Sequence, residues 1–552
     1  MIRRFRPVVL FLLTAVAVSL PASPRAGPSA QTSAPRAPKL VVMVVVDQMR
    51  ADYLETYSSA LSHGLRTLMK EGAWFQRAAY PYLNTITCAG HSTIGTGALP
   101  YRHGMVLNAW FDRAANRSRE CTGDPATTKV SYGGLTGTSD SPAALLVPTL
   151  AEQIRDHAGA RAIAISLKAR SAIGLAGHKA DAVVWFDDRG AWTTSSAFAK
   201  SPPAVFQRFI DEHPLAAEVG KTWERTLDPS AYKLTDDGVG ERPPSGWTRT
   251  FPHPLGTPGG KVDSAFLGQW QRSPFADEYL ERMAEAAIDG EKLGSGSATD
   301  YLGVSLSSLD YVGHAFGPYS HEVQDMLVRL DRTTARLLAH LDARVGRGNY
   351  VLALTSDHGV APIPEQIPGA GRQLSREVGA AIDGALGPIF GPGKYMAFSA
   401  YTDIYLAPGV LDRLKADAKA SAAVLAAVGA LPGIAHAFRS DEISDPEVRT
   451  DPDPVRRAAA LGYHPARSGD LIIVPREHWI LSSSATTHGT LYPYDQRVPV
   501  IFFGAGVKPG EYTGDVTPAD VAPTLAALAH VAFKKLDGQV LTAAVAPRAG
   551  SK

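Results

Sequence analysis

The sequence predicts an α/β protein with a mostly parallel central sheet flanked by helices and with cap insertions. Short runs rich in Val, Ile and Leu alternate with stretches of helical pattern. Residues 41–46 are apolar at every position, which is typical of a parallel strand covered by helices on both faces. Such alternation favours one α/β sheet. The expected strands are 40–46, 162–166, 302–308, 350–355, 470–474 and 498–503, and the expected helices include 61–71, 321–340 and 519–530.

Three long stretches interrupt this alternation within a catalytic domain expected over residues 39–541. Residues 111–148 and 192–296 are rich in Pro, Gly, Ser and charged residues, and residues 372–465 contain strand-like and helical pieces of their own. We expect all three to be insertions that build a cap over one edge of the sheet.

The first thirty residues have the layout of a secretory signal peptide. Arg3, Arg4 and Arg6 precede an uncharged apolar run over residues 8–20, and small residues follow. This run is shorter than the roughly 20 residues that a membrane-spanning helix needs. We therefore expect cleavage and a soluble periplasmic or secreted protein without stable membrane insertion; an uncleaved anchor is the alternative.

Composition gives little reason to expect a polyanionic partner. The chain has 55 Lys and Arg against 54 Asp and Glu, a net charge of +1, so neither nucleic acid nor an anionic membrane is an expected partner. Its two cysteines, Cys88 and Cys121, are compatible with one disulfide in an oxidising compartment or with two separate buried thiols.

Carboxylates and imidazoles stand at the ends of several expected strands. In open α/β sheets, ligands bind at the carboxyl ends of the strands. Asp and neutral His are ordinary zinc ligands, and six of them suit two metals with three protein ligands each. Any one of them alone is equally compatible with a helix cap or a turn, but their common placement at one edge favours a metal centre. The candidate ligands are Asp47, Asp310, His314, Asp357, His358 and His488.

A candidate nucleophile precedes an expected helix near residues 87–96. A hydroxyl at a helix N-terminus has free backbone N–H groups and the positive end of the helix dipole beside it, which suits the attack on a phosphate. Thr85, Thr87, Cys88 and Ser92 all satisfy this pattern, and a simple helix cap is the structural alternative.

Seven separated motifs resemble the alkaline phosphatase superfamily and, more narrowly, the phosphate-irrepressible bacterial alkaline phosphatases with a threonine nucleophile. The resemblance extends over roughly residues 39–541. The motifs are Asp47-Gln48-Met49-Arg50, Thr87-Cys88-Ala89-Gly90-His91, Asn108-Ala109-Trp110, Ser166-Leu167-Lys168-Ala169-Arg170, Asp310 with His314, Ser356-Asp357-His358-Gly359 and Thr487-His488-Gly489.

The resemblance implies a role for each of these residues. One zinc is held by Asp310, His314 and His488, and the other by Asp47, Asp357 and His358, with Thr87 as nucleophile bridging toward the second zinc. Asn108, Lys168 and Arg170 contact the phosphoryl oxygens. The implied activity is hydrolysis of small-molecule phosphate monoesters through a phosphothreonine intermediate, with two Zn²⁺ per chain and a monomeric enzyme.

Three other functions compete with this interpretation. Nucleotide pyrophosphatase/phosphodiesterases resemble the chain near Thr87 but lack the Lys168 and Arg170 pair, which suits the additional charge of a monoester. Sulfatases require a different sequence around the modified residue than the one that follows Cys88. A binding protein on an inactive scaffold conflicts with the complete set of expected ligands.

Overall fold

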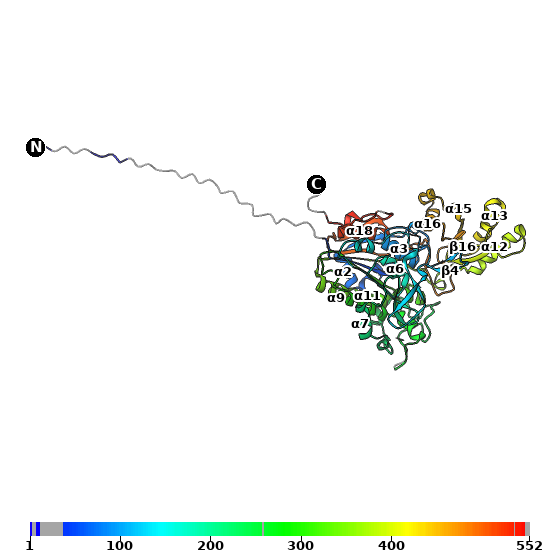
Figure 1. Ribbon diagram of the computed structural model, residues 1–552, viewed down its shortest axis with the longest axis horizontal. Helices are drawn as coiled ribbons and strands as arrows, with labels where there is room; N and C mark the ends of the chain where they lie inside the picture. Colours follow the sequence, from blue (N-terminus) through cyan, green and yellow to red (C-terminus); the bar gives the residue numbers. More distant parts are fainter. Residues whose placement is uncertain (3–6, 11–36, 257–258, 535, 547–552) are drawn as a thin grey trace. The chain divides into compact units, whose positions relative to one another are not determined.

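The computed structural model describes residues 1–2, 7–10, 37–256, 259–534 and 536–546. The chain divides into a small unit, Met1–Pro35 with Pro547–Lys552, and a large unit, Arg36–Ala546, which holds every described helix and strand (Figure 1). Most of the predicted signal peptide, residues 1–30, lies outside the described residues. No helix among the described residues is both long and apolar enough to span a membrane.

An eleven-stranded sheet forms the centre of the large unit, in the order β21-β2-β20-β13-β1-β12-β7-β8-β9-β5-β6. The five strands from β13 to β8 are parallel to one another, whereas β20 and β9 run antiparallel on either side of them. The parallel strands are β13 (Tyr350–Thr355), β1 (Leu40–Val46), β12 (Asp300–Leu306), β7 (Ala162–Ser166) and β8 (Ala182–Asp187). The outer strands are β21 (Gly510–Val516), β2 (Ala73–Ala78), β20 (Val500–Gly504), β9 (Ala191–Ser195), β5 (Gly123–Ser131) and β6 (Thr138–Asp140).

The α/β prediction is therefore confirmed, and five of the six expected strands belong to this sheet. The exception is the run at residues 470–474, which forms β18 (Leu471–Pro475) in a separate four-stranded sheet with β15, β16 and β17. All five residues of β18 are buried, as in a central strand of the large sheet. An apolar pattern of this kind therefore does not reveal which strands it pairs with.

Helices cover both faces of the central sheet, and alternate residues of β1 point into the two cores on either side of it. Val42 and Val44 pack in a cluster with α2, α9 and α11, whereas Val41 and Met43 pack with α3, α5, α6 and α18 (Figure 1). The bounds are α2 (Gly64–Glu71), α9 (Pro274–Gly290) and α11 (His321–Leu341) on one face, and α3 (Thr87–Thr96), α5 (Leu150–Arg155), α6 (Ala169–Ala176) and α18 (Val521–Ala529) on the other. This double burial explains why β1 is apolar at every position.

The three interrupting stretches occupy different places. Residues 111–148 supply β5 and β6, which extend the central sheet, after a hairpin of β3 (Ala109–Asp112) and β4 (Arg117–Glu120). Residues 192–296 supply α7 (Ala204–Glu212), α8 (Ser264–Gln271) and α9, which pack into the core of one face. Residues 372–465 form most of a lobe around β15 (Met396–Ala400), β16 (Asp403–Leu406) and β17 (Ile434–Arg439), with α12 (Ser375–Phe390), α13 (Val410–Ala416), α14 (Ala418–Gly429), α15 (Ser440–Ile443) and α16 (Pro454–Gly462).

Candidate active site

The carboxyl ends of four neighbouring parallel strands bring the predicted site residues together. Asp47 directly follows β1, Asp357 follows β13, and Lys168 follows β7 by two residues. Asp310 lies in the first turn of α10 (Ser308–Phe316), which begins after β12. Because β13, β1, β12 and β7 are adjacent in the sheet, these side chains converge at one edge.

The first predicted metal-ligand set surrounds one oxygen of Asp310. Oδ1 of Asp310 lies 3.2 Å from Nε2 of His314 and 3.7 Å from Nε2 of His488. The other ring nitrogen of each histidine contacts a backbone carbonyl: Nδ1 of His314 lies 2.9 Å from the oxygen of Thr486, and Nδ1 of His488 lies 2.8 Å from that of Thr85. Such contacts orient both rings so that Nε2 faces the carboxylate.

The second predicted set has the same design. Nε2 of His358 lies 3.2 Å from Oδ2 of Asp357 and 3.5 Å from Oδ1 of Asp47, while its Nδ1 lies 3.0 Å from the oxygen of Gly359. The His358 ring stacks on the His488 ring with centroids 3.5 Å apart, so the two sets adjoin. Ligand atoms of Asp310, His358 and His488 all lie within 4.8 Å of one another, which makes His358 the residue common to both sets.

These residues have the chemistry of a metal-binding site. Oδ1 of Asp47 and Oδ2 of Asp357 are buried and accept no hydrogen bond of good geometry from the described residues, although imidazole nitrogens of His91 and His358 lie nearby. A buried carboxylate oxygen is costly unless a positive charge neutralises it. Burial, together with the neighbouring Asp357 carboxylate, raises the pKa of Asp47 to about 7. Burial also holds the pKa of His488 well below its ordinary value, so its imidazole is in the neutral form that binds metals.

Lys168 lies between the two carboxylate sets. Its Nζ donates to Oδ2 of Asp47 at 2.6 Å and to Oδ2 of Asp310 at 2.5 Å. These two carboxylates raise the pKa of the Lys168 ammonium against the effect of its burial, so the side chain is charged. A positive charge is therefore held where the two predicted metal sites meet.

Thr87 is the first residue of α3, as predicted for a hydroxyl at a helix N-terminus. Its Oγ1 lies 3.3 Å from Nε2 of His358, next to the second ligand set. The Thr85 hydroxyl instead donates to the carbonyl of Thr490, and the Cys88 sulfur is oxidised. Of the four residues that the sequence left open, Thr87 alone lines the cavity described below.

Cys88 and Cys121 form a disulfide, whereas the sequence was also compatible with two separate thiols. The disulfide joins α3 to the residue that follows β4, opposite Asn108 directly before β3. Asn108 is held between the two half-cystines: its Oδ1 accepts a hydrogen bond from the N–H of Cys88 at 2.9 Å, and its carbonyl accepts one from the N–H of Cys121 at 2.8 Å. With Oδ1 accepting from Cys88, Nδ2 is the donor end of the Asn108 amide, and it lies near the hydroxyl of Tyr401, which lines the same cavity.

The site opens into a cavity of about 440 Å³. Thr87, Asn108 and Arg170 line it, and Nε of Arg170 is buried without a hydrogen-bond partner among the described residues. A buried guanidinium without a partner is suited to an anionic ligand. Its other lining residues are Arg272, Asp310, Tyr311, His314, Tyr401, Leu481, Ser482, Ser484, Thr487 and His488.

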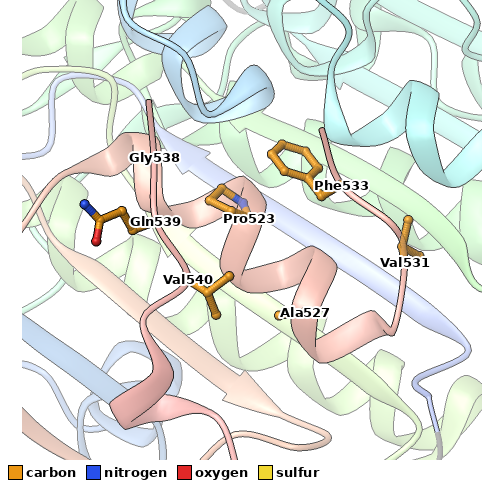
Figure 2. Close-up of a pocket in the computed structure, with 7 residues that line it drawn as sticks. All are labelled: Pro523, Ala527, Val531, Phe533, Gly538, Gln539 and Val540. Carbon is orange, nitrogen blue, oxygen red and sulfur yellow. The ribbon is translucent and has the colours of Figure 1, made fainter. Parts of the chain in front are cut away.

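A second cavity of similar size, about 430 Å³, lies beside α18 (Figure 2). Pro523, Val531 and Phe533 contribute apolar groups to its lining, and its remaining lining residues are Ala527, Gly538, Gln539 and Val540. None of these seven side chains is titratable or a metal ligand, so this cavity has no group for acid–base or nucleophilic chemistry.

Two supporting residues have contacts that the sequence analysis did not predict. Gln48 connects the ligand sets, since its Nε2 donates to Oδ1 of Asp310 at 2.6 Å and its backbone N–H donates to Oδ1 of Asp357 at 3.1 Å. His91 places Nδ1 3.1 Å from Oδ2 of Asp357 and Nε2 2.8 Å from Oγ of Ser305. Both residues lie within the sequence motifs given above, so the motifs could have marked them as candidates. Their contacts could not be predicted, because the partners lie far away in the chain.

This fold, with adjoining carboxylate and imidazole sets beside a threonine hydroxyl, defines a hydrolase of the alkaline phosphatase superfamily. The chain belongs to the type I phosphodiesterase / nucleotide pyrophosphatase family of that superfamily, whose model matches residues 41–497.

Two relatives with high coverage carry phosphatase names. The chain is 32% identical over 521 residues to alkaline phosphatase PafA of Elizabethkingia meningoseptica, covering 91% of this chain and 93% of the relative. It is 33% identical over 516 residues to alkaline phosphatase PhoV of Synechococcus elongatus, covering 90% of each. The crystal structure of wild-type PafA matches with a TM-score of 0.83 at 31% identity, covering 93% of this chain and all of that one. Murine ectonucleotide pyrophosphatase / phosphodiesterase 5 shares the fold, with a TM-score of 0.53 at 15% identity.

Proposed function

We propose that the protein is an alkaline phosphatase that hydrolyses phosphate monoesters, with Thr87 as its nucleophile. The observation that carries this proposal is the position of the Thr87 hydroxyl at the N-terminus of α3, 3.3 Å from His358 and in one cavity with Asn108 and Arg170. The names of the relatives PafA and PhoV support the same activity.

We propose zinc as the metal, with two ions per chain, because the donors are carboxylates and imidazoles in two adjoining sets of three. Asp310, His314 and His488 would hold one ion, and Asp47, Asp357 and His358 the other. When bound, the metals supply positive charge that favours the alkoxide form of a nearby hydroxyl and offsets the charge of the phosphoryl group.

The chain's own residues account for positioning and for a two-step reaction. Oγ1 of Thr87 attacks phosphorus, the bond from phosphorus to the ester oxygen breaks, and the alcohol leaves. Water then attacks the phosphothreonine, which releases inorganic phosphate and restores the hydroxyl. The N–H groups at the start of α3, apart from that of Cys88, which donates to Asn108, and the amide of Asn108 donate hydrogen bonds to phosphoryl oxygens in both steps.

Lys168 and Arg170 favour monoesters over diesters in this proposal. A monoester dianion has one more negative charge on the transferred group, and buried cations stabilise that charge strongly. Arg170 has a buried Nε donor that is unsatisfied, and Lys168 becomes available to a phosphoryl oxygen once Asp47 and Asp310 bind metal.

Hydrolysis of a phosphodiester or a nucleotide pyrophosphate is the second candidate function, because the matching family model has that name. Comparing kcat/KM for phenyl phosphate with that for a bis-aryl phosphodiester separates the two. We expect the monoester to be preferred, and the double substitution Lys168→Ala, Arg170→Ala to reduce this preference at least about tenfold, as the loss of charged hydrogen bonds requires. A wild-type preference for the diester would exclude the monoesterase assignment.

We also propose that the protein acts as a monomer in the periplasm or outside the cell, with a cleaved signal peptide. The Cys88–Cys121 disulfide supports export, because disulfides persist in oxidising compartments.

A further inference from the structure

Arg272 places a third cation at the cavity. It directly follows α8, in the stretch over residues 192–296 that covers one face of the sheet, and it lines the cavity together with Thr87 and Arg170. Its Nη1 donates to the carbonyl of Gly268 at 3.1 Å, which uses one of the five N–H donors of the guanidinium. The remaining donors have no hydrogen-bond acceptor among the residues that the structure describes.

Arg272 has no carboxylate partner among the described residues and lines the cavity, whereas several other arginines of the same stretch are paired. Three of them have an ion pair: Arg225 with Asp236, Arg249 with Asp237, and Arg282 with Glu218. Arg272 forms no ion pair with any residue in the described part of the chain. Its charge is therefore not neutralised by the protein.

Arg272 contacts the same aromatic ring as Lys168 and lines the same cavity as Arg170, the two cations assigned to the transferred phosphoryl group. Its Cζ is 5.5 Å from the centroid of the Tyr311 ring, and Nζ of Lys168 is 4.8 Å from the same centroid. The two charges are thus separated by no more than the sum of these distances. Asp310, a predicted metal ligand, is the one carboxylate among the described residues that line the cavity, so no other acidic group there repels an anion.

We propose that Arg272 binds a second anionic group, a carboxylate or a phosphate, in the leaving group of the substrate. Guanidinium groups bind both anions with two parallel hydrogen bonds. The inference rests on the proposed phosphatase function. It narrows the substrates to phosphate monoesters whose alcohol part carries a carboxylate or a second phosphate. Lys168 and Arg170 contact the transferred group, so Arg272 is a specificity residue that contacts the part of the substrate that leaves.

The test compares three esters with the metal-loaded enzyme: phenyl phosphate, 4-carboxyphenyl phosphate and 1,4-phenylene bisphosphate. The measured quantity is the ratio of kcat/KM for each acidic ester to kcat/KM for phenyl phosphate. Because each variant is compared with the wild type using the same ratio, differences in leaving-group chemistry cancel. The two acidic esters distinguish a carboxylate from a phosphate as the preferred group.

We expect Arg272→Ala to lower this ratio about tenfold for at least one acidic ester, mainly through KM, because one charged hydrogen-bonding partner is lost. Arg272→Lys should restore part of the ratio, since it keeps the charge but not the paired donors. The matched control is Arg282→Ala, which removes an arginine from the same stretch that is paired with Glu218; its ratio should equal that of the wild type.

Two results overturn the inference. In one, Arg272→Ala leaves both ratios unchanged. In the other, it lowers kcat/KM for all three esters by the same factor. That result would mean that Arg272 contacts the transferred phosphoryl group or stabilises the fold. A wild-type enzyme that does not hydrolyse phenyl phosphate would instead refute the proposed phosphatase function, so the two failures are distinguishable.

Discussion

Replacing Gly90 by alanine tests whether the nucleophile's helix and the second metal-ligand set must stay in contact. Gly90 lies in α3, three residues after Thr87, and its Cα faces the backbone of Asp357. A Cβ at Gly90 would lie 2.2 Å from the carbonyl oxygen of Asp357 and 2.6 Å from its Cβ. Neither neighbour is the flexible end of a side chain, so α3 and the chain after β13 must separate.

The size of this separation sets the expected effect. Ordinary van der Waals contact begins at 3.4 Å, so the two segments must move apart by about 1 Å, and a misplacement of that size near reacting groups costs about a hundredfold in rate. Insertion of a methyl group into a packed core also costs about 1–3 kcal/mol of stability. We therefore expect Gly90→Ala to fold and to lose about two orders of magnitude in kcat/KM.

The assay is hydrolysis of phenyl phosphate, with thermal unfolding measured on the same samples. Gly384→Ala is the matched control: Gly384 lies in α12, and a Cβ there meets no heavy atom within 4 Å. This control should retain wild-type activity and gain up to about 1 kcal/mol from helix propensity. If folded Gly90→Ala has the kcat/KM of the wild type, close contact between α3 and Asp357 is not required for activity.

Two further predictions concern the disulfide and the residue that connects the ligand sets. The double substitution Cys88→Ser, Cys121→Ser should lower the free energy of unfolding in urea by about 3–4 kcal/mol, the chain-entropy value for a separation of 33 residues; an unchanged midpoint and slope would contradict this. Gln48→Met keeps the side-chain length but removes the amide that bonds Asp310, and should weaken zinc retention against a chelator about 10–100-fold. Gln76→Met, on the surface, is its control, and equal retention by both variants would show that Gln48 does not support the metal site.

The parts of the fold that local pattern determines were predictable. β1 was predicted with its observed bounds, because a strand buried on both faces is apolar at every position. The run at residues 470–474 is equally apolar, yet it pairs with β16 and β17 in the separate sheet. Strand partners depend on contacts between segments far apart in the sequence, and an apolar run contains no information about them.

The same limit applies to the candidate site. Asp47 and Asp357 were predictable as a group, because both stand at the carboxyl ends of buried strands, although either one alone is compatible with a cap or a turn. The bridging role of Gln48 depends on its left-handed backbone, with φ of 68°, and on contacts more than 260 residues away. Arg272 lies in a stretch without apolar periodicity, so only the packing of α8 and α9 against the sheet reveals that it reaches the cavity.

The most direct test of the account is phenyl phosphate turnover by wild type and Thr87→Ala, with the metal content of both preparations determined by elemental analysis. We predict about two zinc ions per chain in each protein, from the two ligand sets, and a loss of turnover in the variant of at least about a thousandfold, as expected when a nucleophile is removed. Wild-type turnover in a Thr87→Ala protein that retains its metals, or a wild-type enzyme whose turnover is unaffected by strong chelators, would contradict the account.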